Sequence, residues 1–95
     1  MNLYFTRVEL HRATELDYIR LHAAMANAGF SRSVVADDKN RYHLPPAEYV
    51  ITSGLGSQTI LNAANNAVST IGKTGAVLVM EAKEWRSVGL VQVAR

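Results

Sequence analysis

Hydrophobic and polar residues alternate along residues 2–10, which is the pattern of a β-strand with one buried side. One side of this strand carries Tyr4, Thr6, Val8 and Leu10, and the other side carries Leu3, Phe5, Arg7 and Glu9. We expect the Val8 side to face the helices predicted below, which leaves the other side on an open face of the sheet. Leu3 and Phe5 are both apolar, so we expect another surface to pack against this part of the open face.

Residues 15–28 have apolar side chains at three- and four-residue steps, which predicts a helix with one buried stripe. The predicted stripe consists of Leu16, Ile19, Ala23, Ala26 and Phe30, and Leu21 and Met25 widen it. Thr14 is an expected N-cap, and Asp17 three residues later completes a short capping box. Gly29 is the expected stop signal.

A second helical pattern covers residues 58–71. Its predicted stripe consists of Ile60, Ala64, Ala67 and Ile71, with Leu61 and Val68 beside it. Ser57 is the expected N-cap, and Gly72 the expected end. The alanines are small enough to let this helix lie close to a sheet.

The segment between the two helices predicts a pair of strands, 31–37 and 48–53, joined by a long polar connection. Both stretches are rich in the β-branched and aromatic residues that strands favour. Pro45 and Pro46 cannot donate hydrogen bonds within a sheet, so the second strand is expected to begin after them.

Two apolar runs follow the second helix. The run 76–81 is nearly all apolar, which is typical of a central strand packed on both faces. The run 88–93, VGLVQV, predicts an extra C-terminal strand that pairs with an edge of its own sheet or with a second subunit. We favour the second subunit, because this run is too apolar for a solvent-exposed edge.

The order of the predicted elements is β-α-β-β-α-β, which is that of the ferredoxin-like α+β fold. In this fold two helices cover one face of an antiparallel sheet. The 95 residues predict a single domain, 1–95. A chain of this size has room for a two-layer core but not for a deep cavity. A homodimer would enlarge both the core and any site.

Composition excludes several function classes. The chain has no cysteine, which excludes disulfides, thiolate chemistry and cysteine-ligated zinc and fits a reducing cytoplasm. We expect no secretory signal, because no basic segment precedes an apolar run at the N-terminus, and no membrane span. The net charge of +2 permits an anionic partner without requiring one. No polar cluster around an apolar pocket points to a small-molecule cofactor.

Cationic and aromatic side chains make single-stranded RNA the candidate anionic partner. Arginines hold phosphates through paired hydrogen bonds, and rings on an open sheet stack on bases. The candidate cations are Arg7, His11, Arg12, Arg32, Arg41 and His43, and the candidate rings are Phe5, Tyr42 and Tyr49. The alternative is that scattered arginines simply solvate the surface, and no RNP1-type motif is present.

Carboxylates near strand ends are candidates for Mg²⁺, namely Glu9 with Asp37 and Asp38. One carboxylate per subunit would also become a pair across a two-fold axis. The alternative is an ion pair of Glu9 with Arg7 or Arg32. His11 follows Glu9 by two residues, so it is a candidate general acid or base beside a carboxylate.

A series of positions between residues 4 and 60 resembles a known family. These positions are Arg20, Leu21, Met25, Phe30, Ser31, Val35, Ala36, Asp37, Tyr49, Ile51, Thr52, Leu55 and Ile60. In this pattern the chain resembles the GhoS-type antitoxin endoribonucleases of type V toxin–antitoxin systems, which share the ferredoxin-like fold of CRISPR adaptation nucleases. Most of the matched positions are core or turn residues.

The resemblance implies an RNA-cleaving or RNA-binding antitoxin whose site lies on and around the open sheet face. In the related CRISPR nucleases an acidic residue near the end of the first strand holds the metal, and Glu9 corresponds to it. Metal-independent cleavage would use His11 as the base, with Arg7 or Arg12 stabilising the phosphorane. Arg12, Arg32, Arg41, His43 and Tyr49 are the expected RNA contacts. The alternative function is a non-catalytic, dimeric ferredoxin-like module that binds a protein.

Overall fold

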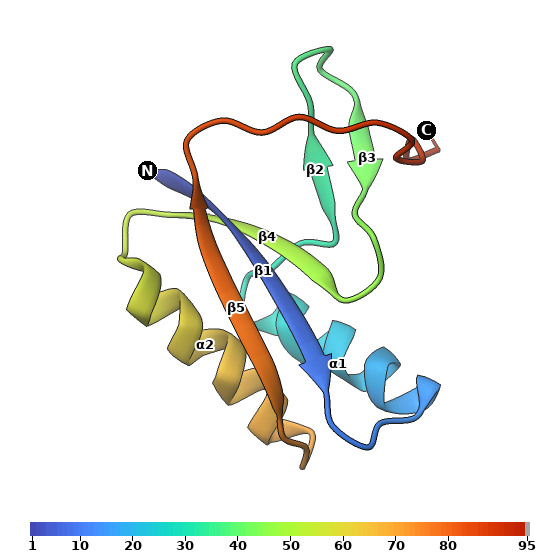
Figure 1. The fold of residues 1–95 in the computed structure, drawn as a ribbon, viewed down its shortest axis with the longest axis vertical. Helices are drawn as coiled ribbons and strands as arrows, with labels where there is room; N and C mark the ends of the chain where they lie inside the picture. Colours follow the sequence, from blue (N-terminus) through green and yellow to red (C-terminus); the bar gives the residue numbers. More distant parts are fainter. Residues whose placement is uncertain (95) are drawn as a thin grey trace.

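The computed structural model describes residues 1–94 as two helices, a three-stranded antiparallel sheet and a separate two-stranded hairpin (Figure 1). The elements are β1 (Asn2–Leu10), α1 (Glu15–Asn27), β2 (Ser33–Val35), β3 (Arg41–His43), β4 (Glu48–Ser53), α2 (Ser57–Thr70) and β5 (Gly75–Ala82). Neither helix is long and apolar enough to cross a membrane.

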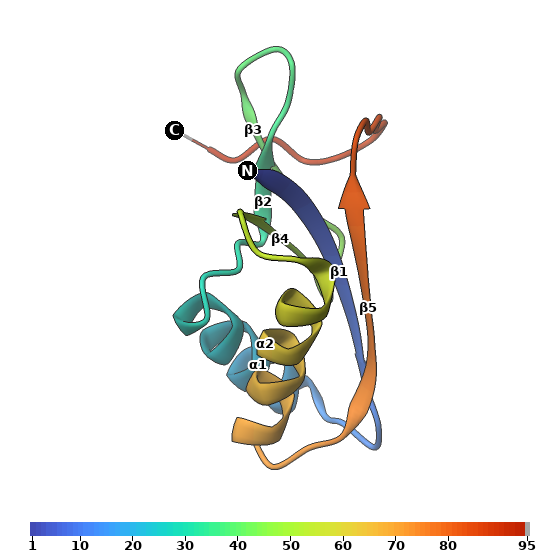
Figure 2. The same ribbon diagram turned by 90° about the vertical axis from the view of Figure 1, so that its left-hand side faces the viewer.

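Both helices lie on the same face of the sheet, and no helix formed by residues 1–94 covers the other face (Figure 2). The strand order is β4-β1-β5, with β1 antiparallel to both neighbours. The β2–β3 hairpin stands beyond one end of the sheet, and the chain after β5 runs across to it (Figure 1). This arrangement is compatible with the expected ferredoxin-like fold.

The alternation along β1 places its side chains as expected. Tyr4, Thr6, Val8 and Leu10 are buried against the helices, whereas Arg7 and Glu9 are exposed on the uncovered face. The core combines these β1 residues with side chains from both helices and β4, chiefly Leu21, Met25, Tyr49, Ile60, Ala64 and Val68. Burial of this apolar surface is the main force that holds the two layers together.

Helix α1 buries a different stripe from the one predicted. Leu21 and Met25 are fully buried, whereas Leu16 and Ile19 remain more than half exposed. The prediction of Leu16 and Ile19 as core residues was therefore wrong. Asp17 explains the rotation, because its carboxylate must turn inward to cap the helix at Thr14 and to reach Lys73.

Helix α2 buries Ile60, Ala64, Ala67 and Val68, as predicted. Its N-cap is Gly56 rather than Ser57, and no side chain accepts a capping hydrogen bond there.

The predicted hairpin of residues 31–37 and 48–53 was wrong in its pairing. The long connection contains its own strand, β3, which pairs with β2 through the register Val34 to Tyr42. Contact with β4 is reduced to the bridge between Ser31 and Val50. The polar turn after β2 allows the chain to fold back at once, and this local pairing replaces the longer one.

The last two strand predictions also need correction. β5 lies at the edge of the sheet and not at its centre, so Leu78 and Met80 are exposed. Residues 88–93 form no strand of the main sheet. Within the same chain they meet β3 through the bridge of Tyr42 with Gln92, flanked by two backbone hydrogen bonds.

Candidate nucleic-acid interface

Arg7 lies on the uncovered face and forms a long ion pair with Glu48 of β4. Its Nε is 4.0 Å from the Glu48 carboxylate, and 71% of the Arg7 side chain is exposed. A pair of this kind contributes at most about 1 kcal/mol to stability. The guanidinium therefore remains available to an anionic ligand at little cost.

Glu9 follows Arg7 on the same face and is exposed. The Glu9 side chain has no hydrogen bond or ion pair within the described part of the chain, and Arg7 pairs with Glu48. The expected alternative of an ion pair of Glu9 with Arg7 or Arg32 is therefore wrong. Its position is set by β5, since a Cβ added at Gly75 would lie 2.6 Å from the Glu9 carbonyl oxygen.

His11 and Arg12 follow the end of β1 and line an open depression with Gly72, Lys73 and Thr74. The volume of the depression is about 500 Å³. The backbone N–H of His11 donates to the Thr74 carbonyl (2.9 Å), and its Nδ1 lies 3.4 Å from the Thr74 hydroxyl. Two turns far apart in sequence are thus held together at this end of the sheet.

Lys73 anchors the floor of this depression. Its ammonium group donates to the Arg12 carbonyl at 3.0 Å and lies 3.1 Å from the Asp17 carboxylate. Hydrogen bonds from the Thr14 backbone and from Lys73 lower the pKa of Asp17. The Lys73 charge is therefore balanced by Asp17, and the cations left for a ligand are His11, when protonated, and Arg12.

Arg41 and His43 lie on β3 of the hairpin, and Arg32 directly precedes β2, close enough to His22 and Tyr49 for its charge to act on both. All three are exposed, and the Arg41 guanidinium donates to the Ser33 hydroxyl at 2.9 Å. Arg41 and His43 alternate with Tyr42 on β3, so they share one side of the hairpin. The predicted cations are thus divided between the β2–β3 hairpin with its base and strand β1 with the turn that follows it.

Tyr49 is not on the surface. It faces the helices, is fully buried, and its hydroxyl lies 2.6 Å from Nδ1 of His22. The prediction of Tyr49 as an RNA-stacking ring is therefore corrected, because no face of the ring reaches solvent. Burial raises the pKa of Tyr49 to about 12. His22 on α1 is the partner in this contact.

The carboxylates predicted to share a metal are also separated. Asp37 and Asp38 lie in the turn between β2 and β3, whereas Glu9 lies near the end of β1 that is farther from this hairpin (Figure 1). Within residues 1–94, no three histidine or acidic side chains come close enough to hold a metal ion. Glu9 alone does not make a Mg²⁺ site within one chain, because Mg²⁺ requires several oxygen ligands at fixed geometry.

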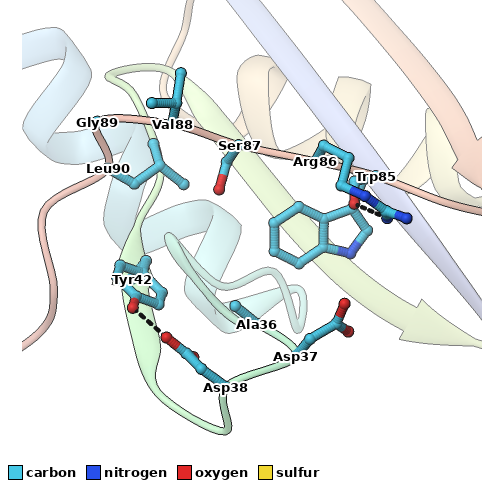
Figure 3. A pocket seen from close by; sticks show the side chains of 10 residues that line it. All are labelled: Ala36, Asp37, Asp38, Tyr42, Trp85, Arg86, Ser87, Val88, Gly89 and Leu90. Carbon is cyan, nitrogen blue, oxygen red and sulfur yellow. Dashed lines mark hydrogen bonds between the residues drawn. The ribbon is translucent and has the colours of Figure 1, made fainter.

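A cavity that the sequence did not predict lies between the hairpin turn and residues 85–90 (Figure 3). Its volume is about 390 Å³, and Trp85, Tyr42 and Asp37 point into it. The Tyr42 hydroxyl donates to Asp38, which lowers the pKa of that carboxyl. No local signal in the sequence indicates this cavity, since it depends on a contact between residues 36–42 and residues 85–90, which are far apart in the chain.

Trp85 continues this surface onto the sheet, where its ring meets Phe5 edge-on at a centroid distance of 5.7 Å. Phe5, Trp85, Leu44, Pro45 and Leu90 line a second, mainly apolar cavity of about 260 Å³. Part of the apolar surface expected at Phe5 is thus covered by the chain itself.

Comparison with known proteins adds no assignment: no model of a known protein family matches the chain, and no curated protein is significantly similar to it.

Proposed function

We propose that this chain is a ferredoxin-like protein that binds single-stranded RNA and acts as an antitoxin-like endoribonuclease. One observation carries the proposal: on the uncovered sheet face, the weakly held Arg7 and the unpartnered Glu9 lead directly to His11 and Arg12 at the strand end. Phosphates of a strand laid along this face would meet Arg7 on β1 and Arg12 after it, with the Glu9 carboxylate and the His11 imidazole between them in the sequence.

The same residues supply the groups that metal-independent RNA cleavage needs. A base must take the proton of a ribose 2′-hydroxyl, and a cation must stabilise the charge that develops on the phosphorane as the 2′-oxygen bonds to phosphorus. The bond from phosphorus to the 5′-oxygen then breaks to leave a 2′,3′-cyclic phosphate, and the leaving 5′-oxygen takes its proton from the protonated base or from water. We assign the first role to His11 and the second to Arg7 or Arg12. Glu9 beside His11 would stabilise the imidazolium that forms.

Aromatic rings along the same face extend the proposed binding surface. Phe5 is partly exposed, and Trp85 packs against its edge. Base–aromatic stacking is tolerant of sequence, which suits a protein that binds single strands without a base code. Arg32, Arg41 and His43 on the hairpin are expected to contact the backbone of a longer strand.

Binding is tested by fluorescence anisotropy with a labelled U- and A-rich RNA over a series of salt concentrations. We expect affinity to fall steeply with salt, because phosphate neutralisation releases counterions. Arg7→Ala and Arg12→Ala should each lower the salt slope by about 1. Lys83→Ala, which removes an exposed cation after β5, is the matched control and should leave the slope unchanged.

Cleavage is tested with the same RNA, with and without EDTA. We expect cleavage that persists in EDTA and is lost in His11→Ala, with Glu9→Ala reduced. Absence of cleavage by the wild type, or equal cleavage by the wild type and both variants, would remove the enzymatic part of the proposal and leave binding to be judged by anisotropy.

A second candidate function, a module that binds a protein partner, is favoured by the apolar cavity between Phe5, Trp85 and Leu90. An apolar interface responds little to salt, unlike RNA binding. Trp85 is the single tryptophan, so its fluorescence reports directly on this surface. This second function is favoured if excess RNA leaves the Trp85 emission unchanged and the anisotropy titration shows no salt-dependent binding.

A further inference from the structure

Strand β5 has one edge without a partner. It pairs along its whole length of eight residues with β1, from Leu3 opposite Ala82 to Leu10 opposite Gly75. In the described part of the chain, no strand or bridge lies on its other side. Alternate backbone N–H and C=O groups along this edge are therefore free to pair with another strand.

The free edge lacks the features that normally protect such a strand. Charged residues, proline and bulges keep natural edge strands from pairing with other chains. Residues 75–80 contain no charged residue and no proline, and Glu81 is the first charge. On the uncovered face, Leu78 is 56% exposed and Met80 is 54% exposed.

The helix beside this edge is equally free of charge. Helix α2 lies along β5, whereas α1 lies toward β4 (Figure 1). None of the fourteen residues of α2 is charged. Its exposed side chains are Ser57, Gln58, Thr59, Asn62, Asn65, Asn66, Ser69 and Thr70. Interfaces between proteins are depleted in charged residues, and neither α2 nor residues 75–80 of β5 places a charge beside this edge.

We propose that β5 pairs antiparallel with β5 of a second copy of this chain, which joins the two three-stranded sheets into one. A two-fold axis makes such an interface self-complementary. With Leu78 opposite Leu78 of the second copy, Ala76 lies opposite Met80, and Val77 lies opposite Val79. On the uncovered face, Met80 of one copy thus lies opposite the small Ala76 of the other, and Leu78 lies opposite Leu78. No charged side chain lies opposite an apolar one within residues 76–80.

This pairing does not depend on RNA binding. Arg7 and Glu9 are on β1, and His11 lies after it, so the proposed RNA site stays open in the dimer. The joined sheet carries the site twice on one continuous face. A longer RNA would then contact both copies, although each copy keeps its own complete set of residues.

The test is sedimentation velocity of the wild type and of Leu78 variants over a range of concentrations. We expect a concentration-dependent dimer for the wild type. Leu78→Lys and Leu78→Glu should each be monomeric, because like charges then lie directly opposite each other across the axis. An equimolar mixture of the two variants should restore the dimer.

Leu16→Lys is the matched control, because Leu16 is 54% exposed on α1 and far from β5. It should leave the dimer intact. A wild type that stays monomeric at every concentration, or a dimer that Leu16→Lys dissociates and Leu78→Lys does not, would overturn the proposal. Circular dichroism confirms that each variant is folded.

Hydrogen exchange of the wild type provides a measurement without substitutions. The outward-facing β5 amides should gain protection as concentration rises, whereas amides of α1 should not. Unchanged β5 exchange across the dimerisation range would contradict the interface. RNA affinity of monomeric Leu78→Lys is measured separately, so failure of the dimer and failure of the RNA proposal remain distinguishable.

Discussion

Among single residues, His22 and Tyr49 show how burial sets chemistry in this protein. The two side chains join α1 to β4, and 2.6 Å separates Nδ1 of His22 from the Tyr49 hydroxyl. Burial, and secondarily the nearby Arg32 charge, lower the pKa of His22 from its ordinary value of 6.5. A neutral imidazole can accept the hydroxyl proton, whereas a protonated one cannot.

This shift predicts a pH-dependent loss of stability. Below about pH 6.5 the unfolded chain takes up a proton at His22 that the folded chain does not yet bind, so the free energy of unfolding falls as pH falls. His22→Gln, which keeps a hydrogen-bonding group but does not titrate, should lose less stability over this window. Urea unfolding at a series of pH values measures the difference, and parallel curves for the two proteins would contradict it.

At the residue scale, a contact could be predicted from the sequence when its two partners lie close together in the chain. The Thr14–Asp17 capping box was predictable because both partners lie within one turn, and the structure confirms it. The burial of Tyr49 was not predictable in this way. It depends on the register that sets Tyr49 opposite Thr6, and a shift of one residue would place the ring on the other face.

At the scale of elements, β1 and β5 come into unusually close contact at Gly75. A methyl group there would lie 2.6 Å from the Glu9 carbonyl oxygen and 3.2 Å from the Leu10 Cα, both of which belong to backbone. Only a residue without a side chain lets the two strands keep this spacing next to the candidate site.

Gly75→Ala should therefore destabilise the fold by about 1–3 kcal/mol, because the strands must separate to accommodate the methyl group. Gly54→Ala is the matched control: no atom lies within 4 Å of a Cβ added there. Its effect should stay within about 0.5 kcal/mol. Thermal or urea unfolding measures both, and equal stabilities for the two variants would show that the contact at Gly75 relaxes freely.

The number and type of the long elements could be predicted from periodicity, but their faces and neighbours could not. Helix α1 offers two apolar stripes, and the ion pair of Asp17 with Lys73 selects the one that contains Leu21. The apolar run of β5 indicated a central strand, although an uncovered edge produces the same pattern. Short strand β3 carried no signal strong enough to separate it from a loop.

At the scale of the whole molecule, the fold separates the candidate cations into two groups. Arg41 and His43 lie on the hairpin and Arg32 at its base, whereas Arg7, His11 and Arg12 lie on β1 or directly after it. The sequence indicated all six but not their separation, which follows from the folding of the hairpin away from the sheet. The proposed chemistry is assigned to the second group, because Glu9 follows Arg7 on the uncovered face of β1 and His11 and Arg12 follow Glu9 in the chain.

The location of RNA binding is tested most directly by NMR titration of the ¹⁵N-labelled protein with a single-stranded RNA at low salt. We predict that the largest shifts occur at Arg7, Glu9, His11, Arg12 and Thr74, with smaller ones along the hairpin. Amides of α1 facing away from the sheet should not move. Shifts confined to α1, or no shifts at saturating RNA, would contradict the account.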